Sequence, residues 1–326
     1  MNAAKIVMTG RPLPEADQMI RDCCEVQCWD QPGIMPRELL FEWLEDAAGL
    51  MSVGAQPARV DEELLAHAPK LRVISQSSVG YDNVDITACT RHGVPFGNTP
   101  GVLTEATADL AFLLLMCAAR RIKESAAIVQ NGEWTARTEI PLGVDLYGKV
   151  LGIVGLGQIG SAVARRARAC GMRIVYHNRR RRDPAAEEGA VYVSFEELLQ
   201  IADFVVVLIP LSNESRWLFR REQFAGMKKT AYFINAARGG IVETDALYEA
   251  VRDGRIAGCA LDVTDPEPIP AEHPLLKLPN VFITPHIGSA TTETRTRMAV
   301  LAAENLLLGI AQKPLKTCVN QEVNYR

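Results

Sequence analysis

The chain has 326 residues, of which 48% are hydrophobic and 23% are charged. This length predicts two domains, each large enough to bury a core. The 35 basic and 39 acidic residues give a net charge of −4. They form no basic or acidic tail, which argues against nucleic acid as a partner. Eight dispersed cysteines without paired CxxC spacing predict neither a disulfide framework nor a metal site, and they favour a reducing cytoplasm.

The first hundred residues alternate between short apolar runs and amphipathic stretches, which predicts a small α/β domain. The apolar runs are Lys5–Met8, Ala48–Val53 and Leu71–Ile74. Cys23, Cys24 and Cys28 lie in a polar stretch that we expect to be helical, with a structural role.

Glycine and proline residues between Gly97 and Gly101 interrupt regular structure and predict a crossing into a second domain. A helix is expected from Thr104 to Ile122, with Thr104 as its cap. The longest apolar run, Leu110–Ala119, has about half the length of a membrane span, and the first residues lack a signal-peptide pattern. We therefore expect no membrane partner.

From Lys149 onward, apolar β-branched runs alternate regularly with helical segments. Six strands are predicted, at Val150–Val154, Arg173–His177, Phe204–Ile209, Ala231–Asn235, Gly258–Val263 and Val281–Thr284. Helices are expected at Gln158–Cys170 before Gly171, after a capping box at Ser194–Glu197, at Thr244–Asp253 before Gly254, and at Thr291–Leu308. The alternation predicts right-handed βαβ units in a doubly wound parallel sheet. We expect the last helix to return to the N-terminal domain.

A glycine-rich turn follows the first of these strands. Val150–Val154 leads directly into Gly155-Leu156-Gly157-Gln158-Ile159-Gly160 and then into a helix. In this context Gly155 permits a tight turn, Gly157 lets the backbone approach a pyrophosphate, and Gly160 lets helix and strand pack closely. The motif therefore predicts a dinucleotide site, whereas a glycine-rich turn without a ligand is the alternative.

The end of the second strand indicates which dinucleotide is bound. An NAD site places a carboxylate there for the ribose 2′-hydroxyl, but this chain has Asn178 and then four arginines, Arg179–Arg182. Guanidinium groups bind a 2′-phosphate through charge-assisted hydrogen bonds. We therefore predict NADP(H) rather than NAD(H), with Arg179 and Arg180 at the phosphate. The alternative is a solvated basic turn.

Three chemically useful side chains follow the last three strands. They are Arg238, Glu267 and His286. Ligands of a doubly wound sheet bind at the carboxyl ends of its strands. Reduction of a 2-oxo acid needs a proton donor, for which His286 is suited, and a cation for the substrate's oxygens, for which Arg238 is suited. Glu267 can hold the other ring nitrogen of His286. Each residue taken alone could equally be an ordinary loop residue.

Several motifs make the chain resemble the D-isomer-specific 2-hydroxyacid dehydrogenase family over nearly its whole length, and most closely the glyoxylate/hydroxypyruvate reductases. The motifs are Ser78–Asp85, Asn98–Thr104, Gly155–Gly160, Asn235–Gly240, Leu261–Pro268 and Pro285–Ala290. The resemblance implies Arg238, Glu267 and His286 as the catalytic set. It also implies that the backbone N–H groups of Val79 and Gly80 bind the substrate carboxylate, and that Asp262 binds the nicotinamide carboxamide.

The resemblance also implies the domain organisation. A Rossmann cofactor domain, residues 100–289, would be inserted into a smaller flavodoxin-like substrate domain, residues 1–99 and 290–326. The expected cofactor contacts are Thr104, Gly155, Gly157, Gln158, Ile159, Gly160, Asn178, Arg179, Arg180, Ile209, Pro210, Ala236, Ala237, Arg238, Asp262, His286 and Gly288. Homodimers are expected, held through the segment Leu110–Tyr147.

The predicted activity is therefore NADPH-dependent reduction of glyoxylate or hydroxypyruvate to a D-2-hydroxy acid, with His286 as proton donor. One departure from the family pattern concerns Arg137, which stands where the similar reductases carry a tryptophan that reaches the neighbouring subunit's active site. A cation there could favour 2-ketogluconate. The sequence is also compatible with an NAD-linked dehydrogenase of a larger acid, and with a dinucleotide-sensing protein like the co-repressors that share this fold.

Overall fold

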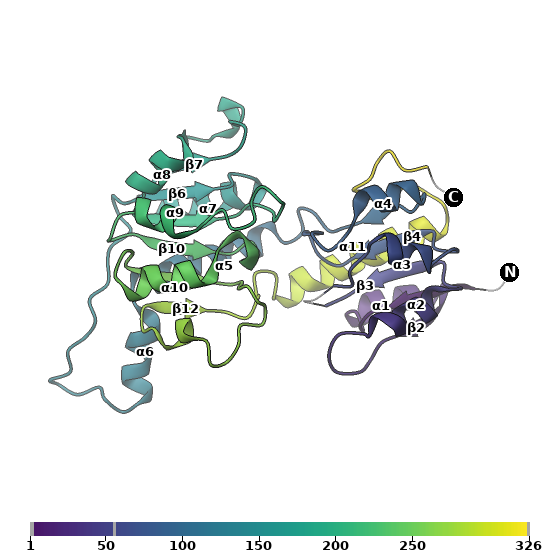
Figure 1. The fold of residues 1–326 in the computed structure, drawn as a ribbon, viewed down its shortest axis with the longest axis horizontal. Helices are drawn as coiled ribbons and strands as arrows, with labels where there is room; N and C mark the ends of the chain where they lie inside the picture. The colour runs from purple at the N-terminus through teal and green to yellow at the C-terminus, as the bar shows by residue number, and fades with distance from the viewer. Residues whose placement is uncertain (1–2, 55–56, 325–326) are drawn as a thin grey trace. The chain divides into compact units, whose positions relative to one another are not determined.

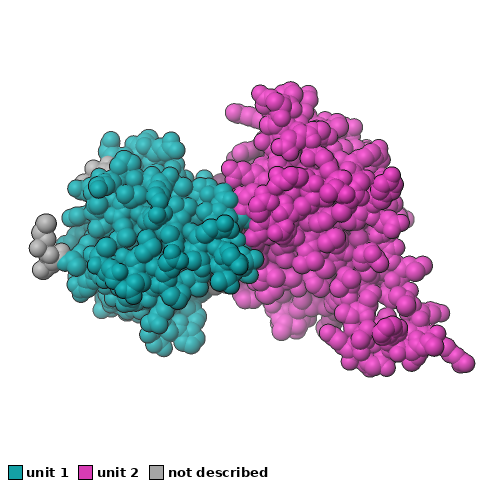
Figure 2. All heavy atoms as spheres, turned by 180° about the vertical axis from the view of Figure 1, so that it is seen from behind, with its two compact units in different colours: residues 1–103, 289–326 teal, residues 104–288 magenta. Residues whose placement is uncertain are grey.

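The computed structural model describes residues 3–54 and 57–324. Contacts within the chain divide it into two compact units (Figure 2). Unit 1 comprises Met1–Leu103 and Ser289–Arg326, and unit 2 comprises Thr104–Gly288. The chain thus leaves unit 1 once, forms unit 2 without interruption, and returns to complete unit 1.

Unit 2 is built on a parallel sheet of seven strands in the order β12-β11-β10-β9-β6-β7-β8 (Figure 1). The strands are β6 (Val150–Val154), β7 (Arg173–His177), β8 (Val191–Tyr192), β9 (Phe204–Val207), β10 (Tyr232–Asn235), β11 (Gly258–Leu261) and β12 (Val281–Ile283). The first strand in sequence, β6, pairs with β7 on one side and with β9 on the other. The order in which strands are added reverses there, and doubly wound sheets bind ligands at such a position.

Helices cover both faces of this sheet, which explains its nearly continuous apolar strands. In β6, Leu151 and Ile153 pack into a cluster with α5 and α7, whereas Val150 and Val154 pack into another with α8, α9 and α10. All five residues of β6 are buried. The helices are α5 (Thr104–Ala119), α6 (Ile122–Gln130), α7 (Gln158–Ala169), α8 (Phe195–Ile201), α9 (Arg221–Gly226) and α10 (Thr244–Arg252), with short 3₁₀ turns at Pro184–Ala186, Gly239–Ile241 and Pro274–Lys277.

Unit 1 is a smaller α/β unit with a parallel sheet of five strands in the flavodoxin-like order β2-β1-β3-β4-β5. The strands are β1 (Ala4–Met8), β2 (Cys24–Cys28), β3 (Gly49–Ser52), β4 (Val73–Gln76) and β5 (Phe96–Gly97). The helices are α1 (Pro14–Arg21), α2 (Arg37–Leu44), α3 (Glu62–Ala66), α4 (Ile86–Arg91) and α11 (Thr292–Ile310). Residues of α1 and α11 pack on one face of the sheet, and residues of α2, α3 and α4 pack on the other.

The predicted fold class is confirmed: both sheets are parallel, with Rossmann-type and flavodoxin-like strand orders. The six strands predicted after Lys149 are present, and the last helix returns to unit 1 as expected. The unpredicted seventh strand, β8, has only two residues, too few to produce a periodic pattern. Among the described helices, none is long and apolar enough to cross a bilayer.

Three local predictions were wrong. Thr104 is the first residue of α5 rather than its cap, and α5 ends at Ala119. Arg121 then adopts a left-handed backbone conformation with φ of 49°, so α6 begins as a separate helix at Ile122. The segment that contains Cys24 and Cys28 is strand β2 rather than a helix, because it pairs along its whole length with β1.

Candidate active site

The loop that carries Arg238 is shaped by a buried asparagine. Asn235, the last residue of β10, accepts a hydrogen bond from the Ala237 N–H (3.0 Å) and donates one to the Arg238 carbonyl (2.9 Å). Gly239 then allows a close approach to the next loop, because a Cβ there would lie 1.8 Å from the Thr264 carbonyl oxygen. The loops after β10 and β11 can therefore touch, which brings the Arg238 charge close to Glu267.

The loop that carries His286 is held by a buried carboxylate. Asp262 is only 2% exposed and accepts hydrogen bonds from the Thr284 hydroxyl (2.7 Å) and from the Ile287 and Gly288 N–H groups (both 2.8 Å). Burial raises the pKa of Asp262, and these hydrogen bonds offset part of that increase. His286 itself donates its N–H to the Asp262 carbonyl (2.9 Å) and adopts a φ of 54°. Such a left-handed conformation is uncommon outside glycine and is typical of functional sites.

Glu267 and His286 are in direct contact. The distance between Glu267 Oε1 and His286 Nδ1 is 2.6 Å, and the two side chains are 32% and 34% exposed. Burial raises the pKa of Glu267, but the hydrogen bond and charge of His286, the Thr264 N–H and the Arg238 charge outweigh it, so the pKa lies below its ordinary value. The ionised carboxylate can therefore hold a protonated imidazole. Among the described residues, none bonds to His286 Nε2, which leaves this nitrogen for a ligand.

The glycine turn after β6 has the form of a phosphate cradle. Gly155 has a φ of 104°, and a Cβ there would lie 2.8 Å from the Leu208 backbone. A Cβ at Gly160 would lie 2.3 Å from the Gly155 carbonyl, whereas one at Gly157 would meet nothing within 4 Å. The open space at Gly157 and the N-terminus of α7, with its unpaired N–H groups and positive dipole, fit a pyrophosphate.

The structure separates the four arginines after β7 into two pairs. Arg181 is bound to Glu187 (2.8 and 3.1 Å), and Arg182 donates to the Ser161 hydroxyl (2.6 Å). Arg179 and Arg180 are exposed, and neither forms an ion pair with a carboxylate of the described residues. Arg179 and Arg180 are therefore the two that neither a carboxylate nor a hydroxyl of the described residues engages. Asn178 before them ties β7 to the glycine turn, because its side-chain oxygen accepts the Leu156 N–H (2.7 Å).

The remaining predicted site residues lie around these loops, with two exceptions. The Thr104 hydroxyl is 3.4 Å from Gln158 Oε1, and Ile209 contacts the position of Gly155. Ile159 lies in the first turn of α7, Pro210 follows β9, Ala236 and Ala237 lie in the Asn235 turn, and Gly288 lies beside Asp262. Val79 and Gly80 are the exceptions, because they belong to unit 1. Within the described ranges, no cluster of three or more His, Cys, Asp or Glu side chains could hold a metal ion.

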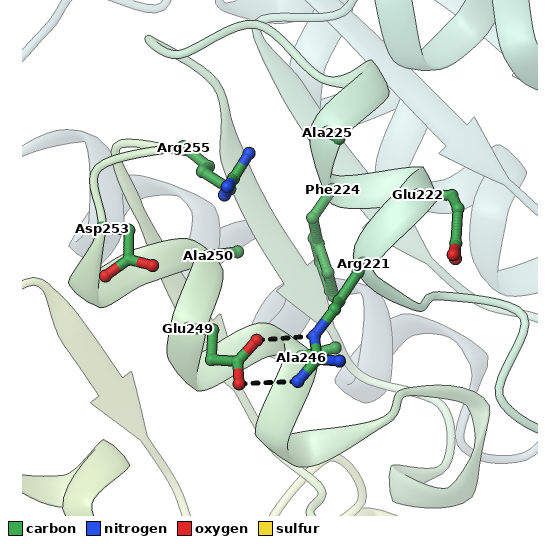
Figure 3. A pocket seen from close by; sticks show the side chains of 9 residues that line it. All are labelled: Arg221, Glu222, Phe224, Ala225, Ala246, Glu249, Ala250, Asp253 and Arg255. Carbon is green, nitrogen blue, oxygen red and sulfur yellow. Dashed lines mark hydrogen bonds and ion pairs between the residues drawn. The ribbon is translucent and has the colours of Figure 1, made fainter.

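A separate groove lies between α9 and α10, with a volume of 360 Å³ (Figure 3). A bidentate ion pair between Arg221 and Glu249 (2.6 and 2.7 Å) spans this groove. None of the predicted site residues lines this groove. Its charged groups are already paired or exposed to solvent, so it is not the candidate active site.

Sequence reasoning missed the residues that hold these loops in place. Asn235 and Thr284 make the contacts described above, and Gly239 permits the loops to meet. One signal was available for Asn235, because a buried strand that ends in an amide must satisfy that amide locally. Thr284 and Gly239 gave no comparable signal, since their partners come from a different strand.

Comparison with known proteins places the chain in a family. The profile described as D-isomer specific 2-hydroxyacid dehydrogenase, NAD binding domain, matches residues 112–288. A glyoxylate reductase from Korarchaeum cryptofilum is 44% identical over 321 residues, which are 97% of this chain and 96% of that protein. The chain belongs to the D-isomer-specific 2-hydroxyacid dehydrogenases. The resemblance inferred from the sequence motifs is thereby confirmed.

Solved structures agree with this assignment. A glyoxylate reductase from Paecilomyes thermophila has a TM-score of 0.89 and 33% identity, and the match covers 99% of this chain and 100% of that chain. An NADPH-dependent glyoxylate/hydroxypyruvate reductase from Sinorhizobium meliloti, in complex with NADP and malonate, has a TM-score of 0.88 and 28% identity, with 100% and 99% covered. The cofactor of this 2-hydroxyacid dehydrogenase is therefore a nicotinamide dinucleotide.

The glycine turn provides a test of the dinucleotide site. Gly157→Ala should raise the Kd for NADPH at least about tenfold, because the added methyl occupies the space a pyrophosphate needs. The melting temperature of the Gly157→Ala protein should stay unchanged, because the added methyl meets no protein atom within 4 Å. Fluorescence titration and thermal unfolding measure the two quantities.

Gly160→Ala is the matched control in the same turn. Its methyl would press on the Gly155 carbonyl, so it should lower the free energy of unfolding by about 1–3 kcal/mol, the usual range for overpacking. Unchanged NADPH binding by a folded Gly157→Ala protein would contradict the cradle.

Proposed function

We propose that this dehydrogenase reduces short 2-oxo acids, glyoxylate and hydroxypyruvate, to D-2-hydroxy acids with NADPH. The observation that carries the proposal is the 2.6 Å contact between Glu267 and His286 at the strand ends where Arg238 also lies. A proton donor, its carboxylate partner and a cation for the substrate are the groups that this reduction requires. The names of the related reductases support the same substrates.

The proposed chemistry assigns one task to each residue. The reduced nicotinamide, when bound, supplies the hydride. Arg238 binds the substrate's oxygens and stabilises the negative charge that develops on the carbonyl oxygen. His286, protonated, donates the proton on Nε2 to that oxygen while Glu267 stabilises the imidazolium. Asp262 fixes the His286 loop, and we also place it at the nicotinamide carboxamide.

The two units have different tasks in this proposal. Unit 2 acts as the cofactor domain, residues 100–289 in the expected division, and unit 1 acts as the substrate domain. The unit 1 loop after β4 contributes the N–H groups of Val79 and Gly80, which bind the substrate carboxylate. Backbone N–H groups suit this task because they can only donate hydrogen bonds, and a carboxylate can only accept them.

The preference for NADPH rests on Arg179 and Arg180. Both side chains are exposed at the end of β7, while Arg181 and Arg182 are engaged elsewhere. Two adjacent guanidinium groups bind a 2′-phosphate strongly, and no carboxylate stands at Asn178 to accept hydrogen bonds from an NAD ribose.

Initial rates of NADPH and NADH oxidation with glyoxylate, hydroxypyruvate, 2-ketogluconate and pyruvate test substrate and cofactor together. We expect fast NADPH oxidation with glyoxylate or hydroxypyruvate. In the double variant Arg179→Ser/Arg180→Ser, the ratio of kcat/KM for NADPH to that for NADH should fall at least about tenfold. Arg181→Ser/Arg182→Ser is the control and should leave that ratio unchanged.

Three further results would each favour a different function. Preference of the wild type for NADH would overturn the assignment of Arg179 and Arg180. Faster reduction of 2-ketogluconate than of glyoxylate would favour the substrate suggested by Arg137, which is exposed beyond α6. Tight NADPH binding without turnover of any acid would favour a dinucleotide sensor.

The contact between Glu267 and His286 predicts a pH dependence. Because the pKa of Glu267 lies below its ordinary value, the carboxylate stays ionised as the pH falls into the mildly acidic range. The reaction should therefore keep its anionic partner for His286 through that range, and kcat/KM should fall only at a lower pH, where Glu267 takes up a proton. Glu267→Gln should lack this acidic limb, because its amide carries no charge at any pH.

Glu267→Gln should also lower kcat/KM by about tenfold to hundredfold at neutral pH. The measurement is the pH profile of kcat/KM for both proteins, with NADPH saturating. An acidic limb at the same pH in both proteins would mean that the ionised Glu267 carboxylate does not support the reaction.

We further propose that the chain forms a homodimer through Leu110–Tyr147. Figure 1 shows α6 and the residues after it reaching away from the rest of unit 2. Eight of the 14 large apolar side chains exposed among the described residues lie in this segment: Leu113, Met116, Ile122, Val129, Trp134, Ile140, Leu142 and Tyr147. Such a concentration is typical of a surface that a partner covers.

We also propose a cytoplasmic location. All eight cysteines are free, which supports a reducing compartment.

Sedimentation equilibrium of point variants tests the dimer. Leu142 is 86% exposed, so Leu142→Asp should shift the wild-type dimer to monomer without changing the melting temperature of a folded subunit. Ile34→Asp is the control, because Ile34 is 65% exposed but belongs to unit 1. A monomeric wild type, or a dimer that tolerates Leu142→Asp, would contradict this interface.

A further inference from the structure

The loop after β4 in unit 1 is held by a buried amide. Gln76 is the last residue of β4 and is fully buried. Its Nε2 lies within hydrogen-bond distance of the Ser78 hydroxyl (2.7 Å), the Gly80 carbonyl (2.9 Å) and Asn83 Oδ1 (3.2 Å). Asn83 in turn donates to Gln76 Oε1 (2.9 Å). The reciprocal pair fixes the orientation of the Gln76 amide, so its N–H groups point at the loop.

Three successive carbonyls of this loop have partners within unit 1. The Ser78 carbonyl accepts the Thr99 N–H (2.9 Å), and the Val79 carbonyl accepts the Asn98 side-chain amide (2.9 Å). The Gly80 carbonyl accepts both Gln76 Nε2 (2.9 Å) and the Ser78 hydroxyl (2.7 Å). Each of these carbonyls therefore has a defined direction, and it is set by a side chain or backbone group outside its own peptide.

This arrangement determines where the N–H groups point. In a trans peptide the N–H is directed opposite to the C=O of the same unit. The N–H groups of Val79, Gly80 and Tyr81 are thus turned away from the groups that hold the carbonyls. None of the three donates a hydrogen bond to any residue that the structure describes. These three donors lack a partner among the described residues; Val79 and Gly80 are half-buried and Tyr81 is exposed, and such backbone donors bind anions.

We propose that Gln76 is a positioning residue for the substrate carboxylate, and that Tyr81 contributes a third backbone N–H beside those of Val79 and Gly80. Gln76 does not touch the substrate; it orients the peptide between Gly80 and Tyr81 through the Gly80 carbonyl. This inference rests on the proposed reduction of 2-oxo acids, since the carboxylate is the part of the substrate that the loop binds. Without the amide, the Gly80 carbonyl keeps only the Ser78 hydroxyl as a partner, so the peptide that carries the Tyr81 N–H is held less firmly.

Gln76→Leu tests this role, because it keeps the apolar bulk and removes both hydrogen-bonding groups. The KM for the 2-oxo acid should rise at least about tenfold, while kcat and the Kd for NADPH change less than about threefold. The matched control is Ser75→Ala, on the preceding residue of β4. Ser75 is fully buried and its hydroxyl donates to the Ala302 carbonyl (2.7 Å), so its loss weakens unit 1 without touching the loop. The melting temperature should fall in both variants, but only Gln76→Leu should change KM.

A second variant and a second readout keep the test decisive if Gln76→Leu folds poorly. Ser78→Ala removes the other donor to the Gly80 carbonyl, together with one of the three contacts of Gln76 Nε2, and should raise KM by about threefold. Gln76→Glu should bind the substrate poorly at neutral pH and recover relative to wild type at about pH 5, where a protonated carboxyl can again donate a hydrogen bond. Gln76→Leu cannot recover in this way, which separates orientation from general destabilisation.

Calorimetry can measure how tightly oxamate binds to the NADPH-loaded protein, and this measurement requires no turnover. We expect the wild type and Ser75→Ala to bind it equally, and Gln76→Leu to bind it at least about tenfold more weakly. Equal oxamate binding and equal KM in a folded Gln76→Leu protein would overturn the role of Gln76. A wild type that binds oxamate but reduces none of the 2-oxo acids would instead contradict the proposed reaction while leaving the anion site intact.

Discussion

Parallel strands all deliver their carboxyl ends to one edge of a sheet, and the candidate active site depends on this constraint. Arg238, Glu267 and His286 follow three different strands, and the glycine turn follows a fourth. No segment of the sequence brings these groups together locally. They meet because β6, β9, β10, β11 and β12 run in the same direction and pair in register. The chemistry is therefore a consequence of sheet topology, and the loops need only small adjustments to complete it.

Those adjustments are made by groups that do not react. Gly239 lacks the side chain that would collide with the Thr264 carbonyl. The Asp262 carboxylate accepts three hydrogen bonds from the loop that carries His286. A buried carboxylate is costly unless it is paired or hydrogen-bonded, and here its hydrogen bonds hold the backbone next to the histidine. The left-handed conformation of His286 is sustained by the same contacts. The position of the proposed proton donor therefore rests on a buried carboxyl group that follows a different strand, β11.

Much of this could be predicted from the sequence, and the reasons for success and failure are physical. The strands of unit 2 were predictable because burial on both faces makes them continuously apolar, and Ser194, Gly171 and Gly254 marked helix ends by their capping chemistry. The β2 segment was mispredicted because its polar composition conceals a strand whose pairing partner lies elsewhere in the chain. The division of the four arginines was also out of reach. Glu187 lies only six residues after Arg181, but nothing in the sequence shows which of the four arginines it binds, and Ser161 comes from α7, which only folding brings near Arg182.

The loops that follow the strands of the two units are shaped in the same way. Gln76, Asn235 and Asp262 each stand at or directly after the carboxyl end of a buried parallel strand, and each bonds the backbone of a loop at that end. A loop that leaves a sheet buried on both faces carries polar backbone groups into a region with little water, so these groups need protein partners. A polar side chain at the strand end satisfies them and, at the same time, gives the loop one conformation. Unpaired donors can then remain on the opposite side of the loop, which is the arrangement that a ligand-binding site requires.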